Sequence, residues 1–488
     1  MNPVGISFNT RSDVTAPGVF VSLRRSWPGS LVRFGGVTLL LLAVSPCFAG
    51  LRVLSEEMTP TPTITFTEIP ERIFTPDPVA KDNIVRFASE TLREIARIRG
   101  LDVRQDVPVL FRGRDFFRNY HLDKIRKDFT PERLQKLLKV SRAMGFEGYK
   151  KAEEFYEEST KDFLRGIRGL YDPDRKEIFI AEWTDPADWE ENVAHELVHA
   201  LQDQHFDLKA YLETLKKLPL DERQARVCVV EGEATALQKE YMLRLSGSGK
   251  TFADTERLSR QNDINMLIGL GRAWFRGQRG RMVIEDVMGF SYAYGGAFFQ
   301  ELLKGRHWSE LDEVHRAPPK TTTEVIHPAR YLDRSVRRAH IRFRGLTDEG
   351  KPLRGYRSIW EEVYGEYGLT ELLSSRTYYK EARTATVGWR GDRLQVFEGP
   401  RGDCILVGYV LFEEASQAAS FFGMYREYLA RKTKPEGSLL WDGEQYRIAH
   451  PKTGRITHLE ARGTSVIFVE DVDPGRVDAL VKELLPAS

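Results

Sequence analysis

The sequence predicts an α+β protein that is built from two domains in tandem. Over residues 81–345 apolar residues recur mostly three or four positions apart, as in amphipathic helices, and the strand-like run EIFIAEW at 177–183 interrupts this pattern. Over residues 385–488 strand-like runs, such as CILVGYVLF, are separated by two helix-like runs. We therefore expect a mainly helical domain with a small sheet, a connecting segment at 346–384 and a small α+β C-terminal domain.

The first 80 residues predict export rather than a packed domain. Arginines precede an apolar run at 37–44, and the small residues after it would let a signal peptidase cut after Ala49. Residues 1–49 are therefore expected to be a cleaved signal peptide, which places the mature chain in the periplasm, on the cell surface or outside the cell. Residues 50–80 are rich in proline and threonine, which predicts an extended linker.

The three cysteines do not predict a disulfide framework. Removal of the signal leaves Cys228 and Cys404, which allow at most one bridge and are expected to be two separate thiols. Cys47 would be the acceptor if the signal belonged to a lipoprotein, but Pro46 occupies the preceding position, where a small residue is needed. Lipidation at Cys47 therefore stays the alternative to simple cleavage.

The balance of charge excludes some classes of partner. The chain has 72 basic and 71 acidic residues, so its net charge of +1 gives no reason to expect a nucleic acid or an anionic membrane as partner. After residue 49 no stretch approaches the roughly 20 apolar residues needed to cross a bilayer, and we expect no membrane span in the mature chain. The partner therefore has to be inferred from a site.

The segment AHELVHALQDQHF at 194–206 has the spacing of a zinc site. The preceding residues Thr-Asp-Pro at 184–186 predict the start of a helix that continues to about Phe206. On this helix His195 and His199 are one turn apart on one face, so both imidazoles can reach one tetrahedral ion. Apolar residues on another side would anchor the helix in a core: Trp189, Val193, Leu197 and Leu201.

Glu196 lies beside the two histidines but not between them. At this offset its carboxylate can take a proton from a water activated by zinc without becoming a ligand, which is the role of a general base. The opposing interpretation is that the three residues share a helix surface by chance, since the bare HExxH pattern also occurs in unrelated proteins. The predicted helix start, the preceding strand and the export signal together favour zinc-dependent hydrolysis.

The third ligand does not follow from this segment alone. His205 stands where a longer zinc motif places its third histidine, but Gln202 replaces the glycine at which that motif bends. Without the bend the helix continues, and ten residues at about 100° each place His205 roughly 80° from His195 and some 15 Å along the axis. Such a separation is too large for a shared ion.

A second helix-like segment, at 227–242, offers two carboxylates. Glu231 could complete a site with two histidines, and the adjacent Gly232 would let this helix approach the first one closely. Glu233 lies about 200° around the helix from Glu231, so the two cannot both face the metal. Glu231, Glu233 and His205 therefore stay as alternatives, as does the interpretation that both glutamates are solvated surface acids.

The motifs HELVH and EGEA resemble those of the gluzincin metallopeptidases. The longer runs GLYDPDRKEIFIAEW, HELVHALQDQHFDL, VVEGEATAL and PPKTTTEVIHPARY resemble a group of largely uncharacterised exported bacterial proteins, over about residues 85–335 and more loosely beyond. The resemblance implies a zincin-like fold and a zinc-dependent peptidase acting on peptides or proteins. It also implies that His195, His199 and Glu231 hold Zn²⁺ and that Glu196 is the general base.

The chain departs from the gluzincin pattern at one outer position. Gluzincins often place an aspartate four residues after the glutamate ligand, where it orients a histidine, and this chain has Thr235 there. We expect another acceptor, Asp203 or Asp207, to take that role.

A hydrolytic site also needs a donor for the oxyanion that develops on the substrate carbonyl. Related enzymes use a tyrosine or a histidine, which makes Tyr292, Tyr294 and His327 candidates, and we select Tyr294 and His327. Each has a structural alternative. The tyrosines before Gly295 could pack the start of a helix, and a histidine before Pro328 could fix a turn.

If strand 177–183 forms the sheet edge above the active-site helix, an extended peptide could add to it through main-chain hydrogen bonds, which favours peptides as substrates. Two other functions compete with a peptidase. One is a zincin-fold protein that binds metal without catalysis, and the other is an exported interaction protein whose function lies in the C-terminal domain. The presence of Glu196 argues against a simple loss of activity.

Overall fold

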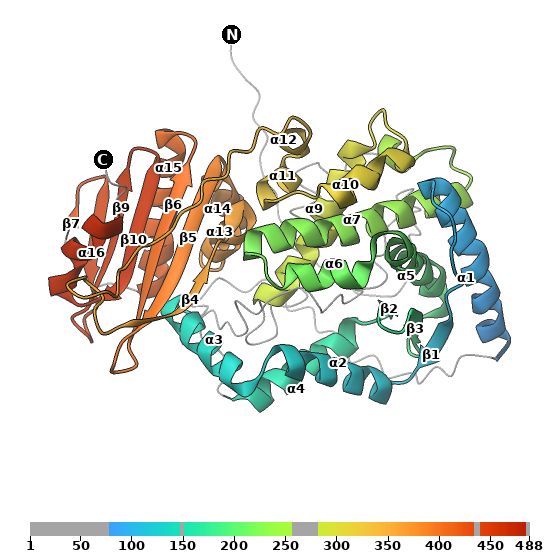
Figure 1. Cartoon of the computed structure of the whole chain (residues 1–488), viewed down its shortest axis with the longest axis horizontal. Helices are drawn as coiled ribbons and strands as arrows, with labels where there is room; N and C mark the ends of the chain where they lie inside the picture. Colours follow the sequence, from blue (N-terminus) through green and yellow to red (C-terminus); the bar gives the residue numbers. More distant parts are fainter. Residues whose placement is uncertain (1–77, 147–150, 256–281, 434–439, 485–488) are drawn as a thin grey trace, which may run out of the picture. The chain divides into compact units, whose positions relative to one another are not determined.

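The chain forms two separate sheets, each with its own helices (Figure 1). The computed structural model describes residues 78–146, 151–255, 282–433 and 440–484. Within these ranges a three-stranded sheet belongs to the N-terminal, mainly helical region, and a seven-stranded sheet belongs to the C-terminal region. The α+β class that the sequence predicts is confirmed.

The predictions for the N-terminus fall almost wholly outside the described residues. They concern the signal peptide at 1–49, Cys47 as a lipid acceptor, and the linker at 50–80, of which the last three positions begin helix α1 (Pro78–Arg99). Among the residues that the structure describes, no helix is both long and apolar enough to cross a membrane.

The N-terminal region is mainly helical, as the spacing of its apolar residues predicts. Local signals start individual helices: at α3 the side chain of Thr130 accepts a hydrogen bond from the backbone N–H of Arg133, and Pro131 occupies the first turn. The elements that follow α1 are α2 (Arg114–Asp128), α3 (Pro131–Ala143), α4 (Ala152–Gly166), α5 (Pro186–Phe206), α6 (Leu208–Leu215), α7 (Leu220–Leu245), η1 (Phe252–Asp254), α9 (Met282–Leu302), η2 (Trp308–Leu311), α10 (Asp312–Arg316), α11 (Thr322–Ile326) and α12 (Pro328–Leu332).

The three-stranded sheet has the order β1-β3-β2. Its strands are β1 (Val109–Arg112), β2 (Gly169–Asp172) and β3 (Glu177–Ala181), and β3 is parallel to β1 and antiparallel to β2. Residues 177–183 do not form the sheet edge, because β1 pairs with β3 on the side that β2 leaves open. The edge strand that packs against α5 is β2.

Helix α5 lies inside the first core. It packs against α1 and α7, and the apolar residues predicted to anchor it are at most 5% exposed: Trp189, Val193, Leu197 and Leu201. Most of α7 is buried as well. Polar side chains between α5 and α7 are therefore enclosed by apolar ones.

The seven-stranded sheet is antiparallel, with the order β4-β5-β6-β10-β9-β8-β7, and both of its faces are covered. In β10, Val466 and Phe468 belong to the core with α13–α15, whereas Ile467 and Val469 belong to the core with α16. The elements are β4 (Arg357–Glu362), α13 (Gly365–Ser374), α14 (Tyr379–Ala385), β5 (Trp389–Glu398), β6 (Cys404–Phe412), α15 (Ala415–Thr433), β7 (Leu440–Trp441), β8 (Gln445–Ala449), β9 (Ile456–Arg462), β10 (Ser465–Val472), η3 (Pro474–Arg476) and α16 (Val477–Leu484).

The segment at 346–384, expected to connect the two domains, contributes to the second sheet. It contains β4, which pairs with β5 at the edge, and the helices α13 and most of α14. Side chains of β4, α13 and α14 pack in one core with α15. The seven-stranded sheet therefore begins before residue 385, at β4.

The first turn of α7 is anchored by buried hydrogen bonds. The backbone N–H of Asp221 donates to the carbonyl of Val363 at 3.1 Å. Oδ1 of Asp221 accepts hydrogen bonds from the backbone N and the hydroxyl of Thr322, at 2.8 and 2.6 Å. Asp221 is fully buried. The helix that carries Glu231 is thereby fixed at its start.

We expect Asp221→Asn to flatten the pH dependence of stability. Burial raises the pKa of Asp221 to about 7, although the hydrogen bonds from Thr322 oppose it. Between about pH 4 and pH 7 the folded chain therefore holds a proton that the unfolded chain, with an aspartate pKa of about 3.9, has released. The free energy of unfolding consequently falls as the pH rises through this range. Asparagine keeps the oxygen that Thr322 binds and does not titrate.

The measurement is urea denaturation at pH 5 and at pH 8. About 3 kcal/mol of the decline in unfolding free energy between these pH values should disappear in D221N, since one pKa unit corresponds to about 1.4 kcal/mol. Asp123→Asn, at an exposed position of α2, is the control and should keep the decline of the wild type. Equal declines in D221N and wild type would contradict the interpretation of a buried proton.

Candidate metal centre

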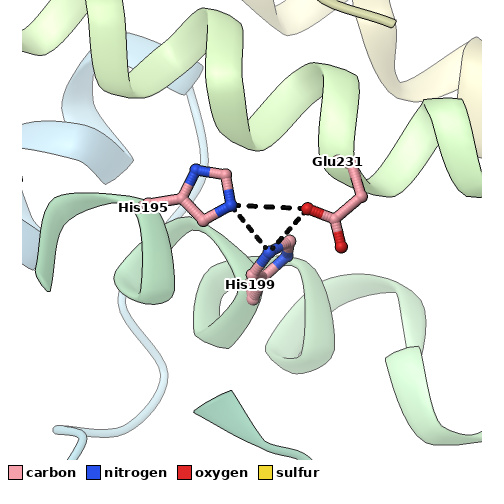
Figure 2. Close-up of side chains that lie close together, drawn as sticks. All are labelled: His195, His199 and Glu231. Carbon is pink, nitrogen blue, oxygen red and sulfur yellow. Dashed lines mark hydrogen bonds and ion pairs between the residues drawn. The ribbon is translucent and has the colours of Figure 1, made fainter. Parts of the chain in front are cut away.

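Two histidines of α5 and one glutamate of α7 point toward one another (Figure 2). Helix α5 begins at Pro186 and continues to Phe206, as the sequence predicts, so His195 and His199 project from one face. Their Nε2 atoms are 3.2 Å apart. Oε2 of Glu231 lies 3.4 Å from Nε2 of His195 and 3.5 Å from Nε2 of His199. The three residues are 4% exposed or less.

This triangle has the dimensions of one face of a tetrahedral zinc site. Bonds of about 2.0–2.1 Å to a central zinc ion give ligand–ligand distances of about 3.3–3.4 Å. The three observed distances are 3.2, 3.4 and 3.5 Å. In addition, Oε2 of Glu231 is buried and has no hydrogen-bond partner among the described residues, and a buried carboxylate oxygen needs one. The donor set therefore fits a zinc ion.

Gln202 determines which nitrogen of His199 faces the triangle. Its amide nitrogen donates hydrogen bonds to the carbonyl of Val230 at 3.0 Å and to Oε2 of Glu233 at 2.8 Å. Oε1 of Gln202 is therefore the acceptor for Nδ1 of His199, at 2.9 Å. With the hydrogen on Nδ1, a lone pair remains on Nε2, as metal binding requires.

Gln238 has the same role for His195. Its amide nitrogen donates to the carbonyl of Glu191 at 3.0 Å, so its Oε1 accepts from Nδ1 of His195, at 3.2 Å. Both histidines thus direct Nε2 lone pairs at the carboxylate of Glu231. Three electron-pair donors that meet in a buried place create a site for a cation.

The opposite charges of Glu231 and His199 stabilise each other, although both side chains are buried. Burial raises the pKa of Glu231, but the two histidines lower it by more, to about 2, and its carboxylate is ionised at neutral pH. Burial lowers the pKa of His199, and Glu231 raises it by more, to about 9. Because Gln202 engages Nδ1, a proton and a metal ion compete for the same atom, Nε2 of His199.

Glu196 is buried beside the histidines and is held by strand β2. Its Oε2 accepts a hydrogen bond from the backbone N–H of Tyr171 at 2.7 Å. Its charge acts on His199 and contributes to the raised pKa of that residue. Gly169 lies against it, because a Cβ at that position would be 3.6 Å from Cγ of Glu196. The edge strand therefore fixes the carboxylate that the sequence predicts as general base.

Glu233, one alternative for the third ligand, belongs to a separate buried network. Its Oε1 accepts a hydrogen bond from Nε of Arg99 at 2.6 Å, and its Oε2 accepts from Nε2 of His315 at 2.7 Å and from Gln202. Burial raises the pKa of Glu233, but Arg99 and His315 lower it well below its usual value. The helical angle of about 200° separates Glu233 from Glu231, which faces the histidine pair.

His205, the other alternative, is carried away from the pair by the continuing helix. Its Nε2 lies 2.7 Å from the backbone carbonyl of Asp102, and the side chain is partly buried. This placement agrees with the expected effect of Gln202, which replaces the glycine of the bent motif.

Tyr294 and His327, the two residues selected for the oxyanion role, contact residues outside the triangle. The hydroxyl of Tyr294 is 3.5 Å from that of Tyr379, and its ring packs in the core beside Phe290. Nε2 of His327 is 2.8 Å from Oε1 of Glu366 on α13. Instead, the ring of Tyr292 lies 5.6 Å from the ring of His195, centroid to centroid. Tyr292 and Tyr294 lie in the middle of α9, and side chains two positions apart on a helix face in different directions.

The predicted outer acceptors are also corrected. Asp203 accepts a hydrogen bond from the hydroxyl of Tyr171 at 2.8 Å, and Asp207 caps α6 through the backbone N–H of Ala210. The acceptors for the histidines are the glutamines 202 and 238. Position 202 follows His199 by three residues, a spacing at which helical side chains meet. Position 238 could have been found as the residue two turns beyond Glu231 on the same face of α7.

Gly232 serves a different contact from the one predicted. It lies against α9 rather than α5: a Cβ there would be 2.5 Å from the carbonyl carbon of Gly295, and a Cβ on Gly295 would be 2.8 Å from the carbonyl oxygen of Cys228. Two glycines thus let α7 and α9 cross in backbone contact beside Glu231. This crossing brings Tyr292 of α9 close to His195.

We expect Gly295→Ala to destabilise the chain by about 1–3 kcal/mol, because the methyl group would be forced against the backbone of α7. Urea denaturation measures the free energy of unfolding. Gly423→Ala is the matched control, since Gly423 lies within α15 and an added Cβ there has no atom within 4 Å. This control should gain about 0.5–1 kcal/mol from helix propensity. A stability of G295A equal to that of the control would refute the close crossing.

Comparison with known proteins concerns the C-terminal region. A family described as Domain of unknown function (DUF8575) matches residues 354–481. The match contains strands β4–β10 and does not include the triangle or Glu196. No curated protein and no solved structure matches the chain. The matched family does not cover the triangle, so the support for a metal site there comes from the geometry of its three residues.

Proposed function

We propose that the chain is a zinc-dependent peptidase of the gluzincin type, exported after removal of residues 1–49. The observation that carries this proposal is the buried triangle of His195, His199 and Glu231 beside Glu196. The ligands come from two helices in the order that gluzincins use, with HExxH on the first helix and the glutamate on the second. The same order supports a zincin-like fold for the N-terminal region.

Glu196 has the position of a general base in this proposal. A zinc ion held by the triangle would lower the pKa of a water molecule and polarise the substrate carbonyl. The carboxylate of Glu196 would take the proton of the attacking water and pass it to the amine that leaves. The hydrogen bond from the backbone of Tyr171 fixes the direction in which this carboxylate faces.

Tyr292 replaces Tyr294 as the proposed donor to the oxyanion. Its ring is adjacent to that of His195, and its side chain is only partly buried. A phenol at this place could donate a hydrogen bond to the substrate carbonyl oxygen as negative charge develops there. His327, which pairs with Glu366, is not assigned a catalytic role here.

Strand β2 supports a peptide as substrate. It is an edge strand of its sheet, and its backbone contacts Glu196 directly. An extended peptide can pair with an edge strand through main-chain hydrogen bonds, which tolerate many side chains.

Zinc content tests the proposal. After expression with zinc, the purified chain should hold close to one equivalent of zinc and cleave members of a mixed peptide library, and a chelator should abolish cleavage until zinc is restored. His199→Ala should lose both properties. His205→Ala removes a histidine of the same helix outside the triangle and should keep both. Less than about half an equivalent of zinc in the wild type would refute a zinc site.

A further inference from the structure

A basic pocket lies at the N-terminal end of α5, outside the metal centre. Its volume is about 510 Å³, and its walls come from α2, α4 and the chain around the start of α5. The described residues that line it include five cations and two carboxylates, an excess of three positive charges. The cations are Arg114, Arg118, Lys161, Arg165 and Arg168, and the carboxylates are Asp185 and Asp188.

Two of these cations, Lys161 and Arg165, have surface contacts that a bound anion could replace. The guanidinium of Arg114 lies 4.7 Å from the ring of Trp183, and that of Arg168 donates to backbone carbonyls at the end of α4. Lys161 and Arg165 pair with carboxylates three residues away on their own exposed helix surface, and such pairs stabilise by less than about 1 kcal/mol. A ligand carboxylate can therefore exchange for them.

The pocket is adjacent to the proposed active site along two elements. On α5, Asp188 precedes His195 by seven residues, which places both on one face about 10.5 Å apart along the axis. On the other side, Arg168 directly precedes Gly169, the residue of β2 that lies against Glu196. An extended peptide spans about 10 Å in three residues. A peptide held at the active site could therefore reach the pocket.

We propose that this pocket binds a carboxylate of the peptide substrate, about three residues from the bond that is cleaved. The proposal rests on the peptidase function proposed above. Arginine suits this role because its planar guanidinium can bind both oxygens of a carboxylate at once. The carboxylate could belong to an aspartate or glutamate side chain or to the peptide C-terminus. The two carboxylates in the wall limit the excess charge, which favours a singly charged group over a phosphate.

Direct binding tests the pocket without requiring catalysis. The full chain carrying Glu196→Gln is titrated at low ionic strength with fluorescent peptides of equal length: one with glutamates, one with glutamines in their place, and both with either a free or an amidated C-terminus. The glutamate peptides should bind at least about tenfold more tightly than the amidated glutamine peptide. If only the free C-terminus increases affinity, the bound group is the terminal carboxylate.

Charge reversal then locates the binding. Arg118→Glu combined with Lys161→Glu should abolish the preference for the acidic peptide and leave the amidated glutamine peptide unaffected. In the control variant, Lys127 and Lys136, two exposed lysines of α2 and α3 outside the pocket, are replaced by glutamate. This variant should retain the preference for the acidic peptide within about twofold. Equal binding of all peptides, or equal effects of the two double variants, would overturn the proposal.

Cleavage by the chain with Glu196 intact separates the two proposals. Binding that depends on the pocket, with no peptide cleaved, would support the pocket as a carboxylate site and refute the peptidase. Cleavage without preference for acidic peptides would support the peptidase and overturn the pocket as a substrate subsite.

Discussion

We expect Glu196→Gln to lower kcat/KM for peptide cleavage by about 10³-fold and to leave the zinc content unchanged. This is the expected result because a general base contributes about 10²–10⁴-fold and an amide cannot accept the proton of the attacking water. The fold should survive, since the side-chain oxygen of glutamine can still accept the hydrogen bond from the backbone of Tyr171. The measurement combines zinc analysis with the rate of cleavage of a peptide identified from the library.

The matched control is Glu190→Gln, the same change at an exposed position of the same helix. It should keep the cleavage rate of the wild type within about twofold, as expected for a surface change away from the site. Equal rates for E196Q and wild type would refute the assigned base. Zinc binding with no cleavage by the wild type would instead favour a metal-binding protein without catalysis.

Glu231→Gln should weaken zinc binding by more than about 100-fold, because loss of a direct ligand has a larger effect than loss of an outer partner, at 10–100-fold. In E231Q a neutral amide would face Nε2 of His195 and Nε2 of His199. It would supply no negative charge to hold a cation or a proton between these nitrogens. Competition with a chromogenic chelator measures the zinc affinity. Circular dichroism shows whether the variant is folded.

The neighbouring glutamate provides the control for this prediction. Glu233→Gln should keep the zinc affinity within about tenfold but destabilise the fold by roughly 3 kcal/mol, because it breaks a buried ion pair with Arg99. The two variants thus separate ligation from packing. If E233Q loses zinc and E231Q keeps it, the choice of the third ligand is wrong.

The site residues whose relative positions could be predicted from the sequence are those that lie on the same helix. The period of the helix places His195 and His199 together, and the absence of a bend at position 202 carries His205 away. The same reasoning separates Glu231 from Glu233 on α7. Local spacing is sufficient in these cases because the relevant side chains lie on a single rigid element.

The rest depends on contacts between distant segments, which one sequence does not specify. Strand β3 is central because β1, more than 60 residues earlier, pairs with its free side. Gly232 contacts α9 rather than α5, and Tyr292 rather than Tyr294 faces His195, because the crossing of two helices sets both relations. Gln238 orients a histidine 43 residues away. Each of these contacts depends on how whole helices and strands are arranged relative to one another, which local spacing does not specify.

The buried hydrogen bonds that start at His199 extend to the first described helix of the chain. Gln202 joins His199 to Glu233, and Glu233 is neutralised by Arg99 at the end of α1. If a metal ion binds at the triangle, its binding and the packing of α1 are linked through these hydrogen bonds, and each favours the other by the same free energy.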